Sequence, residues 1–177
     1  TWACTLKPMS MTNDFLRDPA AEWGHDAHLI ELCPSAPDHV WQQNHVGVFY
    51  SQDGAATWKN VSAPDRGVRF GFPVAVDPED GRTAWVVPAV SDEQRMAIGG
   101  GLFVARTRDG GQSWEHLRDG LPQEHAYDVV YRHALGNGGD VLAFGSTTGN
   151  LYLSEDRGEH WHTVANNLPP IYAVRVV

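Results

Sequence analysis

The chain has 177 residues, and its 22 Asp and Glu against 13 Lys and Arg give a formal net charge of −9. This acidic balance argues against electrostatic binding to nucleic acid or to an anionic membrane surface, so we expect neither as a partner. The sequence has no apolar run near the roughly 20 residues that a membrane-spanning helix needs. Composition leaves the cellular compartment open, and function has to be sought in local patterns.

Short apolar runs bounded by Gly, Pro, Asn and Asp predict an all-β chain, and no window of helical periodicity competes with them. In chain order, the predicted strands are 28–33, 39–43, 46–51, 57–61, 72–76, 84–88, 102–107, 113–117, 127–133, 141–145, 151–154 and 160–164. A last apolar run, 171–177, is predicted to start or close a further unit. The strands fall into three groups of four, which is the organisation of β-propeller blades.

We therefore divide the chain into a leading segment, three blades and a final strand. The boundaries are 1–21 for the end of a preceding blade and a loop, 22–62, 72–118 and 126–165 for the blades, and 171–177 for the closing strand.

One pattern recurs once in each blade: a hydroxyl residue, Asp two positions later, a small residue two after that, and Trp three beyond. The copies are Ser51, Asp53 and Trp58; Thr107, Asp109 and Trp114; and Ser154, Asp156 and Trp161. Asp and Ser/Thr side chains bond to nearby backbone in tight turns, and Gly permits positive φ there. We predict a brace between the third and fourth strands, with the Trp as a core anchor and the Asp as a turn former rather than an acid catalyst.

Two details of the repeat carry further predictions. Ala55 stands where the other copies have Gly, which predicts a slightly altered turn in the first blade. In the middle blade 24 residues separate Trp85 from Asp109, whereas twelve separate Trp41 from Asp53. We predict that the additional twelve residues form an inserted loop.

The repeated pattern resembles the Asp box of sialidase-like BNR-repeat β-propellers, a group of glycosyl-hydrolase-like proteins found in bacteria. The resemblance implies a partial propeller, because propellers usually close with about four to eight blades. We expect the C-terminal half of a ring that missing N-terminal blades or a second copy would complete. Similar boxes occur in xyloglucan-cleaving hydrolases, sortilin-type receptors and photosystem assembly factors, so the pattern indicates the fold more than the function.

The order of strands in a blade predicts where a ligand binds. The box turns share one face with the turns between first and second strands, so the remaining loops gather on the opposite face, where ligands of propellers usually bind. These loops are rich in His, carboxylate, amide and Arg side chains. The candidate ligand-binding residues are Trp23, His25, Asp26, His28, Asn44, His45, Arg69, Arg95, His125 and Tyr127.

Some of the side chains on this face are of the types that bind metal ions. His25, Asp26, His28 and His45 are suitable ligand types, but strand alternation places only some of them on one side, and their spacing matches no closed metal motif. We predict neither a metal site nor a cofactor.

Glycoside hydrolysis is a further reaction that this face could support. It needs an acid and a base or nucleophile on either side of the bond, and Asp92, Glu93 and Glu124 are weak candidates for these roles. A solvated polar loop is the plainer interpretation. We predict a non-catalytic binding or scaffold module for a carbohydrate or protein ligand, with an exo-sialidase-like or other glycan-cleaving hydrolase as the alternative.

Overall fold

The computed structural model describes residues 26–177, so the predicted site residues Trp23 and His25 lie outside the described range. Within that range the regular structure consists of strands and two short 3-10 turns. No helix in the described part is long and apolar enough to cross a membrane.

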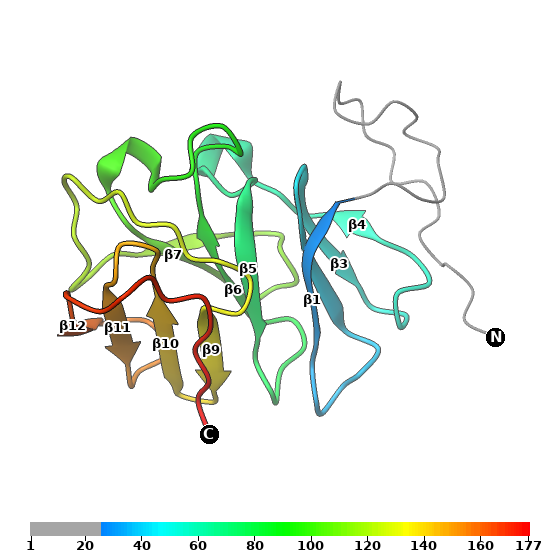
Figure 1. Ribbon diagram of the computed structural model, residues 1–177. Coiled ribbons are helices and arrows are strands. Elements are labelled where there is room, and N and C mark those ends of the chain that lie inside the picture. The colour runs from blue at the N-terminus through cyan, green and yellow to red at the C-terminus, as the bar shows by residue number, and fades with distance from the viewer. Residues whose placement is uncertain (1–25) are drawn as a thin grey trace.

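Twelve strands form three four-stranded antiparallel sheets, each a simple meander in chain order (Figure 1). Blade 1 contains β1 (Ala27–Leu32), β2 (Val40–Asn44), β3 (Gly47–Ser51) and β4 (Lys59–Asn60). Blade 2 contains β5 (Gly71–Val76), β6 (Ala84–Pro88), β7 (Val104–Thr107) and β8 (Glu115–Leu117). Blade 3 contains β9 (Leu135–Gly138), β10 (Val141–Gly145), β11 (Leu151–Ser154) and β12 (His162–Ala165). The first strands lie innermost, β1 against β5 and β5 against β9, and the predicted all-β blade architecture is confirmed.

The hydrophobic core lies between neighbouring blades. Trp41 of blade 1 is fully buried and meets Trp114 of blade 2 edge to face, with ring centroids 6.2 Å apart. The indole N–H of Trp114 donates to the carbonyl of Val61 at 2.9 Å. Phe144 and Trp161, both of blade 3, make an edge contact at 4.9 Å within the core that blades 2 and 3 share. Such aromatic pairs contribute about 0.5–1.5 kcal/mol beyond the burial of their surface, so blade-to-blade packing holds the fold together.

Each box turn is closed by the same hydrogen bonds. In blade 1 the hydroxyl of Ser51 donates to Asp53 at 2.8 Å and accepts from the amide of Ala55 at 3.0 Å. The amide of Thr57 donates to the same carboxylate at 2.8 Å, and its hydroxyl donates at 2.6 Å. Equivalent bonds brace the turns of blades 2 and 3 at Asp109 and Asp156, except that His160 of blade 3 has no hydroxyl and donates only its amide.

These bonds lower the pKa of the box carboxylates. The hydroxyl and amide of Thr57 lower the pKa of Asp53 to about 2. The amide of His160 is the largest of the causes that lower the pKa of Asp156. Burial would raise the pKa of Asp109, but hydrogen bonds from Ser113 and Thr107 lower it. A carboxylate held ionised by donors on its own turn is suited to bracing, as the sequence predicts.

The box turn of each blade also bonds to the turn between the first and second strands of the same blade. Amides of Gly54, Gly110 and Arg157 donate to carbonyls of Asp38, Arg82 and Asp140, at 3.0, 3.0 and 2.8 Å. Both sets of turns therefore lie on one face, and the remaining loops lie on the other.

Ala55 does not alter its turn. Its φ of 70° lies in the same left-handed region as those of Gly111 and Gly158, and its amide makes the same hydrogen bond. The prediction of a changed turn is wrong, because the bonds to Ser51 and Asp53 impose the backbone conformation on Ala as they do on Gly.

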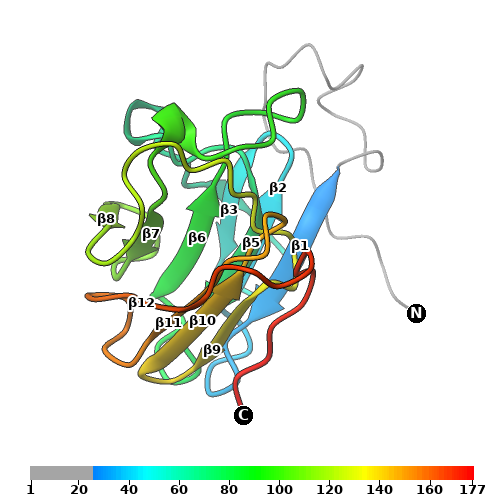
Figure 2. The same ribbon diagram turned by 60° about the vertical axis from the view of Figure 1, so that its left-hand side comes forward.

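Two predicted strands differ in the structure. Residues 127–133 form no strand, and the first strand of blade 3 is β9, whose Gly-rich sequence resembles a turn. The glycines of β9 are explained by a segment that runs along this strand in both views (Figures 1 and 2). A Cβ at Gly136 would come within 3.2 Å of the carbonyl of Val174, so close backbone approach favours Gly there.

That neighbouring segment is 171–177, which was also predicted as a strand. It makes one isolated parallel bridge, between His133 and Ala173, and the amide of Val174 donates to the carbonyl of His133 at 2.7 Å. Among the described residues, this bridge is the segment's only β-pairing, and the segment is part of none of the three sheets.

Candidate functional site

A cleft of about 460 Å³ opens on the face opposite the box turns. One wall is the long loop between β6 and β7, which is the insertion predicted from the repeat spacing and which contains the 3-10 turn η2 (Ile98–Gly100). The other wall is the link that follows η1 (Pro64–Arg66) into β5, and the turn between β2 and β3 adds one side chain. The lining residues are His45, Pro64, Gly67, Arg69, Phe70, Ala89, Val90, Ser91, Asp92, Glu93 and Ile98.

Two carboxylates on the inserted loop give the cleft its charge. Asp92 forms an ion pair with Arg95, whose guanidinium also donates to the hydroxyl of Tyr131 at 3.3 Å. A hydrogen bond from Ser91 is the main cause that lowers the pKa of Glu93. Glu93 is therefore a carboxylate at neutral pH, able to accept hydrogen bonds from a ligand.

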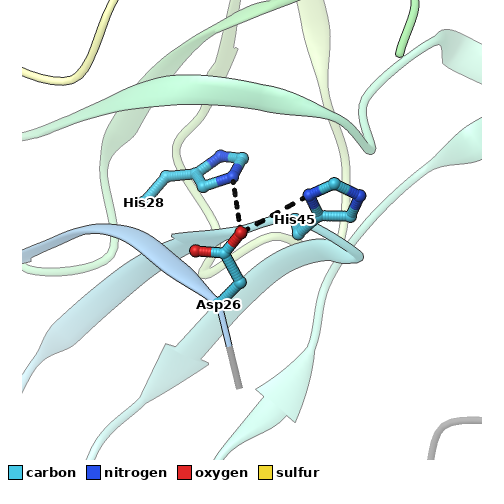
Figure 3. Close-up of side chains that lie close together, drawn as sticks. All are labelled: Asp26, His28 and His45. Atoms are coloured by element: carbon cyan, nitrogen blue, oxygen red, sulfur yellow. Dashed lines mark ion pairs between the residues drawn. The ribbon is translucent and has the colours of Figure 1, made fainter. Parts of the chain in front are cut away.

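Beside this cleft, three side chains from blade 1 converge: Asp26, His28 and His45 (Figure 3). One Asp26 carboxylate oxygen lies 3.6 Å from Nε2 of His28 and 3.6 Å from Nδ1 of His45. The backbone brings them together, because the amide of His45 donates to the carbonyl of Asp26 at 2.9 Å. Pairing of β1 with β2 shifts register between Ala27 and Leu29, and at this irregularity the side chain of His28 faces Gly71 and Phe72 of β5.

His28 is the buried member of this group, with 5% of its surface exposed. Its Nδ1 lies 2.6 Å from the carbonyl of Gly71, and a carbonyl only accepts, so Nδ1 carries the proton and Nε2 presents a lone pair. Burial lowers the pKa of His28, although the bond to Gly71 and the charge of Asp26 act against that shift. Its ring stacks on Phe72 with centroids 4.7 Å apart.

An aromatic series leads outward from Phe72. Its ring lies 4.8 Å from that of Tyr131, which lies 5.8 Å from that of Tyr172. Tyr172 is 61% exposed, and the guanidinium carbons of Arg95 and Arg132 each lie 5.6 Å from the Phe72 ring centroid. Sequence analysis did not assign Tyr131 and Tyr172 to the site; their proximity depends on the course of residues 171–177.

The structure gathers some of the predicted site residues and separates others. His45, Arg69, Asp92 and Glu93 line the cleft, with Asp26, His28 and Arg95 next to it. Asn44 is buried and uses its amide within its own turn, accepting from the amide of Val46 at 3.1 Å. The segment carrying Glu124, His125 and Tyr127 is exposed, does not line the cleft, and is joined to the inserted loop through the amide of Ala126 and the carbonyl of Gly100.

Comparison with known proteins connects this chain to larger propellers. No family model matches it. It is 35% identical over 111 residues to an oligoxyloglucan-reducing end-specific xyloglucanase of Emericella nidulans, an alignment that covers 60% of this chain and 12% of that enzyme. The chain thus spans only a small part of the curated relative that it matches.

Solved structures with the same arrangement include a xyloglucanase and a YCF48 protein. The GH74 xyloglucanase from Xanthomonas campestris superposes with a TM-score of 0.56 at 21% identity, covering 78% of this chain and 20% of that one. YCF48 from Cyanidioschyzon merolae superposes with a TM-score of 0.54 at 22% identity, covering 81% and 41%. At these identities the likeness concerns the fold alone. Sheet topology and structural neighbours together identify residues 26–177 as blades of a β-propeller.

Proposed function

We propose that these blades belong to a propeller that binds a glycan chain in the cleft. The observation that carries the proposal is the cleft itself, which combines the apolar surfaces of Phe70 and Ile98 with the charged groups of Arg69, Asp92 and Glu93. Sugar hydroxyls bond well to charged donors and acceptors, while their C–H faces pack on aromatic rings. A concave site with a few polar groups favours a small or chain-like ligand over a flat protein partner.

The relative from Emericella nidulans, named for its action on oligoxyloglucan, supports a neutral glucan of the xyloglucan kind as ligand. The finer assignment to the sialidase-like class rests on the three braced box turns and would predict an acidic sugar instead. A sialylated oligosaccharide is therefore the matched comparison ligand.

Binding without cleavage is the leading form of this proposal. Glycoside hydrolysis needs one protonated carboxyl group as general acid. Glu93 has a lowered pKa. Burial raises the pKa of Glu31, but Glu31 pairs with Trp41 near the end of β1 that leads into the turn on the box-turn face, away from the cleft.

Hydrolysis is the second candidate, favoured by the neighbouring carboxylates Asp92 and Glu93 in the cleft.

Calorimetric titration with a xyloglucan oligosaccharide tests the binding proposal. We expect saturable binding that Glu93→Gln weakens by roughly 10- to 150-fold, because a hydrogen bond to a charged group contributes roughly 1.5–3 kcal/mol. Glu155→Gln is the matched control, since Glu155 is an exposed carboxylate within the box turn of blade 3. Absence of binding by the unaltered chain, or equal weakening by the control, would contradict the proposal.

Product analysis by mass spectrometry separates the two candidates. Binding with no cleavage of the oligosaccharide supports the binding module. Cleavage that is abolished in Asp92→Asn or Glu93→Gln supports the hydrolase.

A further inference from the structure

We propose that Asp26, His28 and His45 form a binding site for one divalent transition-metal ion of the zinc type. Two imidazole nitrogens and one carboxylate oxygen are a ligand set that such ions prefer, and three protein ligands leave positions open for water or a ligand oxygen. The site goes beyond glycan binding and does not depend on it.

The separations between the three groups are the first observation in its favour. Both nitrogen-to-oxygen distances are 3.6 Å, which exceeds the 2.7–3.2 Å of a direct hydrogen bond. If an ion lay about 2.1 Å from the oxygen and from the nitrogen of one such pair, the oxygen–ion–nitrogen angle would be roughly 120°, near the tetrahedral value. All three ligand atoms lie within 4.8 Å of one another, so a movement of less than about 1 Å brings the set within reach of one ion.

The second observation is the tautomer of His28. Its Nδ1–H is held by the carbonyl of Gly71, so Nε2 directs a lone pair towards the carboxylate of Asp26 (Figure 3). Two acceptors then face each other, one on a buried side chain and one on an exposed side chain, an arrangement that a cation between them stabilises. A backbone carbonyl bound to the second ring nitrogen is the usual outer support of a metal-binding histidine.

The surroundings provide rigidity on one side and access on the other. Phe70 lies edge-on to both imidazoles, with centroids 5.6 Å from His28 and 5.3 Å from His45, and Phe72 stacks on His28. The side chain of His28 is only 2% exposed, whereas that of Asp26 is 47% exposed. Two ligands are therefore fixed by packing, and an ion can enter from the side of Asp26.

Zinc titration of the complete, tag-free chain by calorimetry, without sugar, tests this site, and Co²⁺ absorption reports the coordination geometry. We expect one equivalent to bind. Asp26→Asn and His45→Gln should each weaken binding by more than the 10–100-fold that loss of an outer-shell partner causes. These variants are chosen over His28→Gln, because His28 is buried and its replacement risks the fold.

The control tests whether zinc binds to exposed histidines outside the proposed site. His160 and His162 are exposed neighbours with ring centroids 4.6 Å apart, and His160→Gln with His162→Gln should leave zinc affinity unchanged. Zinc should also raise the unfolding temperature of the unaltered chain and not that of Asp26→Asn, since a ligand that binds only the folded state stabilises it. No saturable binding, unchanged affinity in both site variants, or loss of binding in the control would overturn the proposal.

Discussion

The box turn of blade 1 shares its backbone-bracing hydrogen bonds with those of blades 2 and 3 but differs from them in packing. A Cβ at Gly111 would lie 2.4 Å from Val61 of blade 1, and one at Gly158 would lie 2.7 Å from Leu117 of blade 2. Blade 1 has Ala55 at this position and a half-buried Trp58, with no described blade preceding them. The pattern therefore braces its own turn and also packs on the preceding blade. In the described part of blade 1 only the bracing is seen.

The largest effect should come from the Trp anchors. Trp114→Ala should destabilise the fold by about 3–5 kcal/mol, because Trp114 is 4% exposed and bonded to the carbonyl of Val61. Trp58→Ala, the matched change in blade 1, should cost about 1–2 kcal/mol, since Trp58 is only partly buried. Urea unfolding followed by fluorescence measures both. Equal losses in the two variants would contradict a packing difference between these turns.

The spacing of the box pattern was enough to predict the blades, because each copy carries its bracing and anchoring residues within a short segment. It also predicted the insertion between β6 and β7, which proved to be a wall of the cleft. Asp26, His28 and His45 were recognised as suitable ligand types but were not expected to converge, because regular alternation does not anticipate the register shift between Ala27 and Leu29. Such long-range and irregular features depend on packing between blades.

The second prediction concerns pH and the bracing that all three turns share. The pKa of Asp53 falls from 3.8 to about 2 on folding, so its contribution to stability is fully present above pH 3.8 and is lost as pH falls through 2. Asp53→Asn should therefore lower the urea midpoint of unfolding at neutral pH. In acid, the urea midpoints of the variant and of the unaltered chain should approach each other. Asp65 is an exposed carboxylate in η1, outside the box turns, and serves as the control. The difference in urea midpoint between Asp65→Asn and the unaltered chain should not shrink comparably in acid.

A constant difference between Asp53→Asn and the unaltered chain down to about pH 2 would mean that the ionised carboxylate does not brace this turn.

The smallest effect should come from Ala55, where bracing and packing can be separated. A left-handed conformation costs an L-residue about 1–2 kcal/mol, and Ala55 adopts one at φ 70°. Ala55→Gly removes that strain but increases the freedom of the unfolded chain, so a net stabilisation of about 0.5–1 kcal/mol is expected. Ala56→Gly is the control; Ala56 has no positive φ, so the same change there should destabilise slightly. If Ala55→Gly gained nothing over this control, the box bonds would not hold Ala55 in the left-handed region. Blade 1 would then differ from blades 2 and 3 in its turn as well as in its packing.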